Sequence, residues 1–278
     1  MRKIEIIKDV YSSVLGFGCA PILGAVSGKV AERAINIAID CGINHFDLAR
    51  SYGYGEAESF LGKVLKGKRN EVVIATKFGI KANWKSSLLK PLKPIVRYVK
   101  GHPSIKERKN NESGNNLKIK ADKFHDRLPI TESIMVSSLE KSLKCLKTDY
   151  VDILFVHEPL NSIKDIELIL LCADKLKRDG KIKGIGLACM QDQMYLHNLY
   201  LNQFDILQFN NSPGMISYEE IKTQRSNFYN IMFSPLNGGN SDLSPSEKLL
   251  KLTNDFPESV ILCSMFNEKH IKTNSLIF

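Results

Sequence analysis

Eight short apolar runs recur along this chain, and longer stretches with helical periodicity separate them. The runs are rich in Val, Ile, Leu and Phe at consecutive positions. Consecutive burial is typical of parallel strands that are covered on both faces. The pattern therefore predicts a parallel sheet whose strands alternate with helices. The predicted strands are Val14–Ala20, His45–Ala49, Val72–Phe78, Val151–His157, Ile182–Cys189, Ile206–Asn210, Ile231–Pro235 and Val260–Met265.

Amphipathic stretches fill the gaps between these runs. Apolar residues recur in them at three- and four-residue spacing, which is the periodicity of a helix with one apolar face. Thr131 is expected to cap its helix, and Gly42 and Gly180 are expected to end helices in the left-handed conformation. The predicted helices are Ser27–Cys41, Ala57–Leu65, Thr131–Leu146, Ile163–Arg178, Gln191–Leu201 and Ser244–Thr253.

Eight strands that alternate with helices or long connections match a (β/α)8 barrel, formed here by residues 1–278 as one domain. A doubly wound open sheet is the main competitor, but it usually places a Gly-rich phosphate loop after its first strand. Here Gly16-Phe-Gly18 is followed by Cys-Ala-Pro, without a third glycine that opens a helix. Two short runs, Ile4–Ile7 and Tyr11–Ser13, are expected to form a hairpin that plugs the bottom of the barrel.

The basic excess of the chain lies in one segment. The formal net charge is +9, and residues 81–127 carry 13 Lys and Arg against four acidic residues, so the remainder is neutral. A nucleic-acid-binding body is therefore disfavoured. The segment, predicted as a basic insertion over residues 80–130, follows the third strand, on the side where such barrels carry catalysis. Two interpretations stay open: the cations select an anionic substrate or an acidic carrier, or they solvate a loose lid.

Cysteine usage and the first residues indicate a cytoplasmic protein. None of the six cysteines forms a CxxC pair and most lie in apolar runs, so buried reduced thiols are expected. The start, MRKIEIIKDV, has no long apolar core and is not expected to be a signal peptide. No apolar run approaches the ~20 residues that span a bilayer, so no membrane partner is expected. The six histidines are dispersed, and no metal site is expected.

Four residues that can carry acid–base chemistry stand at the ends of three successive predicted strands or just beyond. Asp47 and Tyr52 belong to "HFDLARSYGYGEAE", Lys77 to "VVIATKFG" and His157 to "VDILFVHEP". A tyrosine has a pKa near ~10, and a nearby ammonium group favours its phenolate. An aspartate can orient the lysine, and a histidine can position a carbonyl by a hydrogen bond.

Each of these residues also has a purely structural interpretation. Asp47 can cap a turn, Tyr52 can pack half-buried, Lys77 can be a solvated strand end and His157 a core histidine. Their coincidence at one barrel mouth favours a catalytic site.

At these motifs the chain resembles the aldo-keto reductases, which are NAD(P)H-dependent (β/α)8 enzymes. The resemblance runs from about residue 14 to 274 and includes "GINHFDLARSYGYGEAE", "IATKFG" and "SLEKSLKCLKTDYVDILFVHEP". It implies that Asp47, Tyr52, Lys77 and His157 are the catalytic residues, with Tyr54 at the rim. It also implies an oxidoreductase that reduces the carbonyl group of an aldehyde, a ketone or a sugar-like small molecule.

The resemblance further implies a set of cofactor contacts. Gln208, in "ILQFNN", matches the residue that holds the nicotinamide carboxamide, and Phe233 matches the aromatic residue that stacks on the ring. The implied cofactor is NADP, with NAD as the alternative. The complete set of implied contacts is Gln208, Phe233, Ser234, Leu236, Gly238, Ser264 and Asn274.

The chain departs from the family pattern in three places. Ala188 and Cys189 replace the usual Ser-Asn pair after the fifth strand. After the eighth strand, "SMFNEKHIKTN" places Phe266 and Asn267 where the pattern has a basic residue for the 2′-phosphate of NADP. The region from Asn237 onwards is short, so a truncated last helix is expected.

These departures keep other functions open. The second hypothesis is a binding or regulatory protein with the same fold and a decayed cofactor site. The third is a barrel enzyme, such as a lyase or epimerase, that uses the Tyr–Lys pair for proton transfer. The sequence does not determine the substrate or the oligomeric state.

Overall fold

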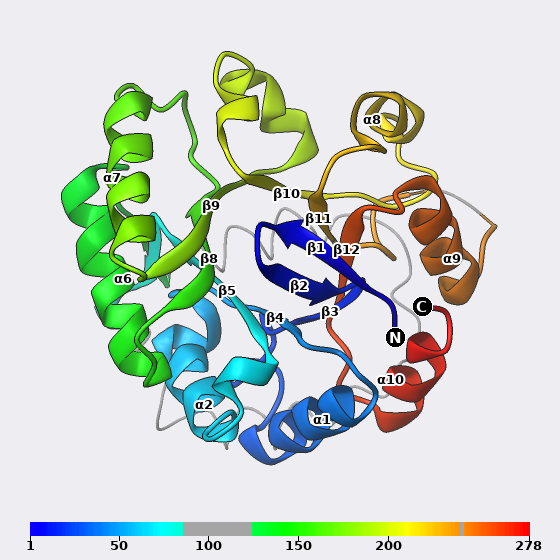
Figure 1. Ribbon diagram of the computed structural model, residues 1–278. Helices are drawn as coiled ribbons and strands as arrows, with labels where there is room; N and C mark the ends of the chain where they lie inside the picture. Colours follow the sequence, from blue (N-terminus) through cyan, green and yellow to red (C-terminus); the bar gives the residue numbers. More distant parts are fainter. Residues whose placement is uncertain (86–123, 240–241) are drawn as a thin grey trace.

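Eight parallel strands close into a barrel in the computed structural model, which describes residues 1–85, 124–239 and 242–278. Each strand pairs with the next one along the chain, and the last pairs with the first (Figure 1). This closure confirms the predicted (β/α)8 barrel and excludes the open doubly wound sheet. The strands are β3 (Leu15–Gly18), β4 (His45–Asp47), β5 (Val73–Phe78), β8 (Val151–His157), β9 (Ile182–Ala188), β10 (Ile206–Asn210), β11 (Asn230–Phe233) and β12 (Ser259–Cys263).

Two apolar layers explain why the strands are apolar at consecutive positions. Side chains such as Ile153 and Phe155 fill the inside of the barrel, while Leu154 and Val156 pack outward under the helices. Both faces of each strand are thereby removed from water, as in other parallel sheets. The strands are somewhat shorter than predicted at several ends, because the terminal apolar residues continue into the connecting loops.

Helices surround the barrel (Figure 1), and three of them begin at side-chain caps, of which the sequence predicted the one at Thr131. The side-chain oxygens of Ser27, Thr131 and Ser244 each accept a hydrogen bond from a first-turn amide. Gly42 and Gly180 have positive φ angles at helix ends, as predicted. The helices are α1 (Gly28–Asp40), α2 (Ala57–Val64), α6 (Glu132–Leu146), α7 (Ile166–Arg178), α8 (Tyr218–Arg225), α9 (Pro245–Asp255) and α10 (Glu268–Ser275). Helix α8 was not among those predicted, and α10, with eight residues, is the short last helix that the sequence predicted without bounds.

The predicted helix Gln191–Leu201 is wrong. The segment forms two 3₁₀ turns, η3 (Gln191–His197) and η4 (Leu201–Gln203). Tertiary contacts fix it in this form: the Tyr200 hydroxyl lies 2.7 Å from the His197 Nδ1 atom and accepts a 2.7 Å hydrogen bond from the Ile163 amide. The connection between β9 and β10 therefore consists of 3₁₀ turns, which are wound more tightly than an α-helix.

A hairpin closes the amino-terminal end of the barrel, as predicted. Strands β1 (Lys3–Ile7) and β2 (Val10–Ser13) pair antiparallel and lie across the opening (Figure 1). Ile6 and Val10 are buried against the interior layer. The Ser13 amide donates a 2.6 Å hydrogen bond to Asn44 Oδ1, which ties the hairpin to the loop before β4. The other end of the barrel stays available for a site.

A short antiparallel pair marks the base of the predicted basic insertion. Strand β6 (Ile80–Ala82) pairs with β7 (His125–Arg127), with Ile80 opposite Arg127 and Ala82 opposite His125. Most of the insertion lies outside the described residues. Two further 3₁₀ turns are η1 (Tyr52–Gly55) and η2 (Arg69–Glu71). Among the described residues, no helix has the length and apolar character needed to cross a bilayer.

Candidate active site

Three neighbouring strands bring the predicted catalytic side chains to the carboxyl end of the barrel. Asp47 ends β4 and His157 ends β8, while Lys77 is the fifth residue of β5. Asp47 pairs with the residue two before Lys77, and Lys77 pairs with the residue two before His157. Because side chains alternate along a strand, this two-residue stagger keeps all three facing inward. Together with Tyr52 they line a cavity of about 150 Å³.

Lys77 and Asp47 form a buried ion pair. The Nζ atom lies 2.7 Å from each carboxylate oxygen of Asp47 and donates a third hydrogen bond of 2.7 Å to the Leu48 carbonyl. An ammonium group has three donors, so this arrangement uses all of them. The aspartate therefore fixes the position of the lysine, as the sequence predicted.

Tyr52 reaches the cavity from η1, a turn that the glycines of "SYGYG" make possible. Gly53 has φ +59°, and a Cβ atom there would lie 2.6 Å from the Ile22 carbonyl oxygen. The Tyr52 ring centroid is 5.3 Å from Lys77 Nζ. Tyr54 lies beyond it, with its ring edge-to-face against Phe124.

The pKa of the Tyr52 hydroxyl is raised well above its usual range. Burial is the main cause, because it penalises the phenolate, and the negative charge of Asp47 adds to it. The lowering of this pKa that the sequence predicted from Lys77 does not outweigh burial, and all three lysine donors are directed at Asp47 and Leu48. Tyr52 is consequently a protonated phenol at neutral pH.

His157 lies beside Tyr52 in an edge-to-face arrangement, with ring centroids 6.3 Å apart. Burial lowers the pKa of its imidazole well below the usual range, and the charge of Lys77 adds to this effect. The ring is therefore neutral and carries one N–H donor. Its Nδ1 atom is buried and has no hydrogen-bond partner among the described residues.

Gln208 joins the site from β10, across the barrel. Its side chain is buried, and Nε2 donates a 2.7 Å hydrogen bond to Asp47 Oδ1. The sequence pointed to Gln208 as a cofactor contact only, so the link to Asp47 is new.

The remaining predicted cofactor contacts divide into two groups. Phe233, Ser234 and Ser264 line the cavity with Gln208. Ser234 has φ +55°, which turns the chain sharply after β11. Leu236, Gly238 and Asn274 lie outside the cavity lining; the Asn274 side-chain amide is 3.3 Å from the Met265 sulfur. Asn267, at the position where the family pattern has a basic residue, caps α10 by accepting a hydrogen bond from the Lys269 amide.

Glu158 is a cavity residue that the sequence analysis did not select. It directly follows His157, has φ +43°, and lines the cavity together with it. Arg127, at the base of the insertion, donates a 2.6 Å hydrogen bond to the Glu158 carbonyl, and its guanidinium lies 3.8 Å from the carboxylate. The adjacency of Glu158 to a catalytic candidate was the available signal. A carboxylate thus stands at the mouth of the site.

Ala188, the last residue of β9, and Cys189, the residue after it, stand where the family pattern has a Ser-Asn pair, and they do not offer the polar side-chain contacts of that pair. Ala188 lines the cavity, and Cys189 is buried, with burial raising the pKa of its thiol to about 12. Within residues 1–85, 124–239 and 242–278, no group of three or more metal-ligating side chains is found.

Comparison with known proteins decides the family. The sequence model described as "Aldo/keto reductase family" matches residues 14–239, which include the four predicted catalytic residues and Gln208. The chain belongs to the aldo/keto reductase family. Among curated relatives of this reductase-family chain, aldo-keto reductase YhdN of Bacillus subtilis (strain 168) is 30% identical over 185 residues, covering 64% of this chain and 44% of that protein.

Two further similarities agree with this assignment. D-threo-aldose 1-dehydrogenase of a Pseudomonas species is 30% identical over 184 residues, covering 63% of this chain and 50% of that protein. The solved structure of an aldo-keto reductase from Klebsiella pneumoniae in complex with NADPH matches this fold with a TM-score of 0.68 at 16% identity, covering 99% of this chain and 89% of that one. The chain spans about half the length of the curated relatives that it matches.

Proposed function

We propose that this chain is an NADP-dependent oxidoreductase that reduces the carbonyl group of a small molecule. The observation that carries the proposal is the convergence of Asp47, Tyr52, Lys77 and His157 on one cavity. A protonated tyrosine, a neutral histidine and a buried Lys–Asp pair are the parts that proton transfer to a carbonyl oxygen requires.

The cavity wall suits a nicotinamide group. Gln208 offers an amide for the carboxamide, and Phe233 offers an aromatic face. Gly18 also lines the cavity, and a Cβ atom there would lie 2.8 Å from Ser264 Oγ, so the wall is flat at this point. NADP is the proposed cofactor because the Klebsiella structure with the same fold binds NADPH; NAD is the alternative, since Asn267 carries no positive charge.

When bound, a reduced nicotinamide supplies the hydride that adds to the carbonyl carbon. Tyr52 gives its phenolic proton to the carbonyl oxygen and becomes a phenolate, which takes a proton back from solvent. Lys77 stabilises that phenolate by its charge, and Asp47 holds the lysine in place. His157 donates its single N–H to the carbonyl oxygen and so positions it. The reverse sequence oxidises an alcohol.

The substrate that this cavity favours is a neutral hydroxylated carbonyl compound. Most of the lining side chains are polar, and Glu158 offers oxygens that accept hydrogen bonds from hydroxyl groups. The Arg127 guanidinium lies 3.8 Å from this carboxylate, so the pair carries no net charge that would favour an ionic substrate. The name of the Pseudomonas relative, an aldose dehydrogenase, points in the same direction. An anionic or carrier-bound substrate would depend on basic residues of the insertion that lie outside the described residues.

Two observations favour a second candidate, a binding or regulatory protein without turnover. Ala188 gives the cavity no polar side-chain group, and the Gln208 amide is already bonded to Asp47. Both features weaken the proposed hydrogen bonding to the nicotinamide carboxamide. Titration with NADPH and with NADH, followed by the fluorescence of the reduced nicotinamide, separates the two candidates. If neither nucleotide binds, the proposed oxidoreductase function is rejected.

The Tyr52→Phe variant tests the proposed reaction. The phenyl ring keeps the shape of the cavity but has no proton to give. We expect turnover of aldoses and simple aldehydes, followed by NADPH absorbance, to fall at least about 100-fold. NADPH affinity should stay within about threefold of the parent protein, because the hydroxyl is not a proposed cofactor contact.

Tyr54→Phe is the matched control, since it removes the same hydroxyl two residues away and outside the cavity lining. Its turnover should equal that of the parent protein. A Tyr52→Phe variant that turns over at the parent rate would refute the role of Tyr52.

A further inference from the structure

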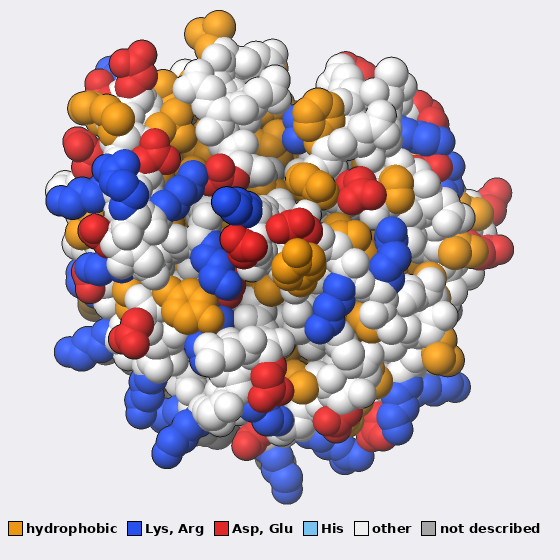
Figure 2. All heavy atoms as spheres, in the orientation of Figure 1, with side chains coloured by type: hydrophobic (Ala, Val, Ile, Leu, Met, Phe, Trp, Pro, Cys, Tyr) orange, Lys and Arg blue, Asp and Glu red, His pale blue; other side chains and the backbone are white. Residues whose placement is uncertain are grey.

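A second concavity, of about 660 Å³, lies between the η3–η4 segment and α8 on the outside of the barrel. Figure 2 shows the surface notched at its upper rim, between the two elements that Figure 1 places there. The groove shares no lining residue with the catalytic cavity. It exists because the β9–β10 connection consists of 3₁₀ turns, which leave the flank of α8 uncovered.

The groove has an apolar wall. Met194, Met215, Tyr195 and Phe228 line it, and Ile216 is fully exposed at its edge. Its volume lies in the range of small-molecule sites, which are mostly apolar with a few fixed polar groups. The groove therefore favours a ligand with an apolar body.

Arg225 supplies the fixed polar group. The residue is only 8% exposed, yet it lines the groove. Its Nε atom donates to Asn230 Oδ1 at 3.1 Å and Nη1 donates to Asn202 Oδ1 at 3.4 Å, while its Cζ atom lies 4.5 Å from the Phe228 ring centroid. Among the described residues, no carboxylate lies within 4 Å of this guanidinium.

A buried guanidinium without an opposite charge is costly, and an anion is what compensates it. A guanidinium has five N–H donors, and the two asparagines accept two of them. The remaining donors of the planar fork match the two oxygens of one carboxylate.

The other charges of the groove restrict the ligand further. Asp192 and Glu220 also line it, and Glu220 accepts a hydrogen bond from Gln224. Glu220 precedes Arg225 by five residues on α8, about 7.5 Å along the helix axis. The groove is therefore negative toward the start of α8 and positive toward its end, which disfavours a dianion or a ligand with two anionic ends.

We infer that this groove binds a small monocarboxylate with an apolar body, the carboxylate paired with Arg225 and the body lying on Phe228 and the methionines. The site is separate from the proposed catalytic cavity and does not depend on the proposed reaction. Inorganic phosphate is a poor ligand for it, because a single guanidinium cannot neutralise a dianion.

Calorimetric titration of the full chain with octanoate, 1-octanol and inorganic phosphate tests the inference. We expect octanoate to bind at one site, at least about tenfold more tightly than either other probe. Arg225→Gln should weaken octanoate roughly 10- to 100-fold, which is the loss of a charge-assisted hydrogen-bonded pair, and leave octanol unchanged.

Phe228→Ala is the second variant, since this side chain is 50% exposed and we expect its truncation to leave the fold intact. It should weaken both octanoate and octanol. Arg33→Gln, an exposed arginine on α1, is the matched control and should change nothing. Equal binding of octanoate and octanol, or octanoate binding that survives Phe228→Ala or a folded Arg225→Gln variant, would overturn the inference.

Discussion

At the residue scale, the Asp47 carboxylate connects the two halves of the site. It accepts hydrogen bonds from Lys77, which belongs to the proposed proton-transfer machinery, and from Gln208, which belongs to the proposed nicotinamide contact. Residues from β5 and β10 thus share one acceptor on β4. A change at Asp47 therefore affects lysine orientation and the position of the glutamine amide together.

His45, two residues before Asp47, makes the stability of the fold depend on pH. Burial lowers the pKa of its imidazole to about 4. In the unfolded chain the His45 imidazole binds a proton near pH 6.5, whereas in the folded chain it stays neutral down to about pH 4. The free energy of unfolding therefore keeps its full value above pH 6.5 and falls as the pH drops toward 4. The difference corresponds to roughly 3 kcal/mol. Urea unfolding at a series of pH values should show this slope, and His45→Gln should reduce it to the part that comes from the other buried histidines, such as His157.

The exposed His270→Gln variant is the control, and it should keep the slope of the parent protein. Identical slopes for the parent and a folded His45→Gln protein would mean that other groups cause the pH dependence.

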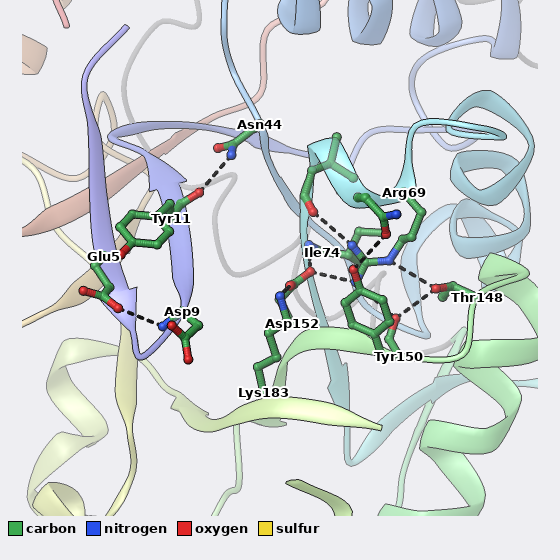
Figure 3. A network of polar contacts seen from close by, with 12 residues as sticks. Glu5, Asp9, Tyr11, Asn44, Arg69, Ile74, Thr148, Tyr150, Asp152 and Lys183 are labelled. Atoms are coloured by element: carbon green, nitrogen blue, oxygen red, sulfur yellow. Dashed lines mark hydrogen bonds and ion pairs between the residues drawn. The ribbon is translucent and has the colours of Figure 1, made fainter. Parts of the chain in front are cut away.

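At the scale of elements, one carboxylate at the amino-terminal end of β8 ties three strands together (Figure 3). Asp152 accepts a 2.7 Å hydrogen bond from Arg69, which precedes β5, and a 2.9 Å bond from the Ile74 amide of β5. Lys183 on β9 lies 3.0 Å from its other oxygen. The Arg69 guanidinium also stacks on the Tyr150 ring at 3.8 Å. This network fixes the register of β5, β8 and β9, which in turn sets the stagger of the site residues.

Asp152→Asn should destabilise the protein by roughly 3 kcal/mol, because it leaves the largely buried Arg69 guanidinium without its opposite charge. Urea unfolding measures the change. Lys183→Gln removes a partner that is 39% exposed and should cost at most about 1 kcal/mol. If Asp152→Asn lowers the free energy of unfolding no more than Lys183→Gln does, the network is not a significant source of stability.

The sequence predicted the elements wherever local chemistry and packing agreed. Asp47, Lys77 and His157 were found because their strands are otherwise mostly apolar and carry one of these polar residues at or next to the carboxyl end. The η3–η4 segment was mispredicted because its conformation depends on the distant Ile163 amide bonded to Tyr200, which no local pattern reports. The Gln208–Asp47 bond was missed for the same reason, since 161 residues separate the two side chains.

At the scale of the whole molecule, the two ends of the barrel have different tasks. The β1–β2 hairpin seals one end with Ile6 and Val10, and the site cavity occupies the other. Apolar side chains, including Phe155, fill the space between them. Stability and chemistry are therefore largely separable along the barrel axis.

Ile6→Ala tests this separation. The side chain is fully buried under the barrel, so its truncation should cost about 2–4 kcal/mol in urea unfolding. At a temperature where the variant is folded, its NADPH affinity should match that of the parent protein. Tyr11→Ala, on the exposed face of the same hairpin, is the control and should change stability little. A parallel loss of NADPH affinity would contradict the separation.

The β6–β7 pair has a consequence for how such a protein can diversify. Because Ile80 lies opposite Arg127, the chain leaves the barrel and returns to it at one point beside the site. Whatever the residues between these strands do, their number and kind can change while the barrel strands keep their spacing. We therefore expect that the sequence between β6 and β7 can be exchanged without moving the residues that we propose for catalysis.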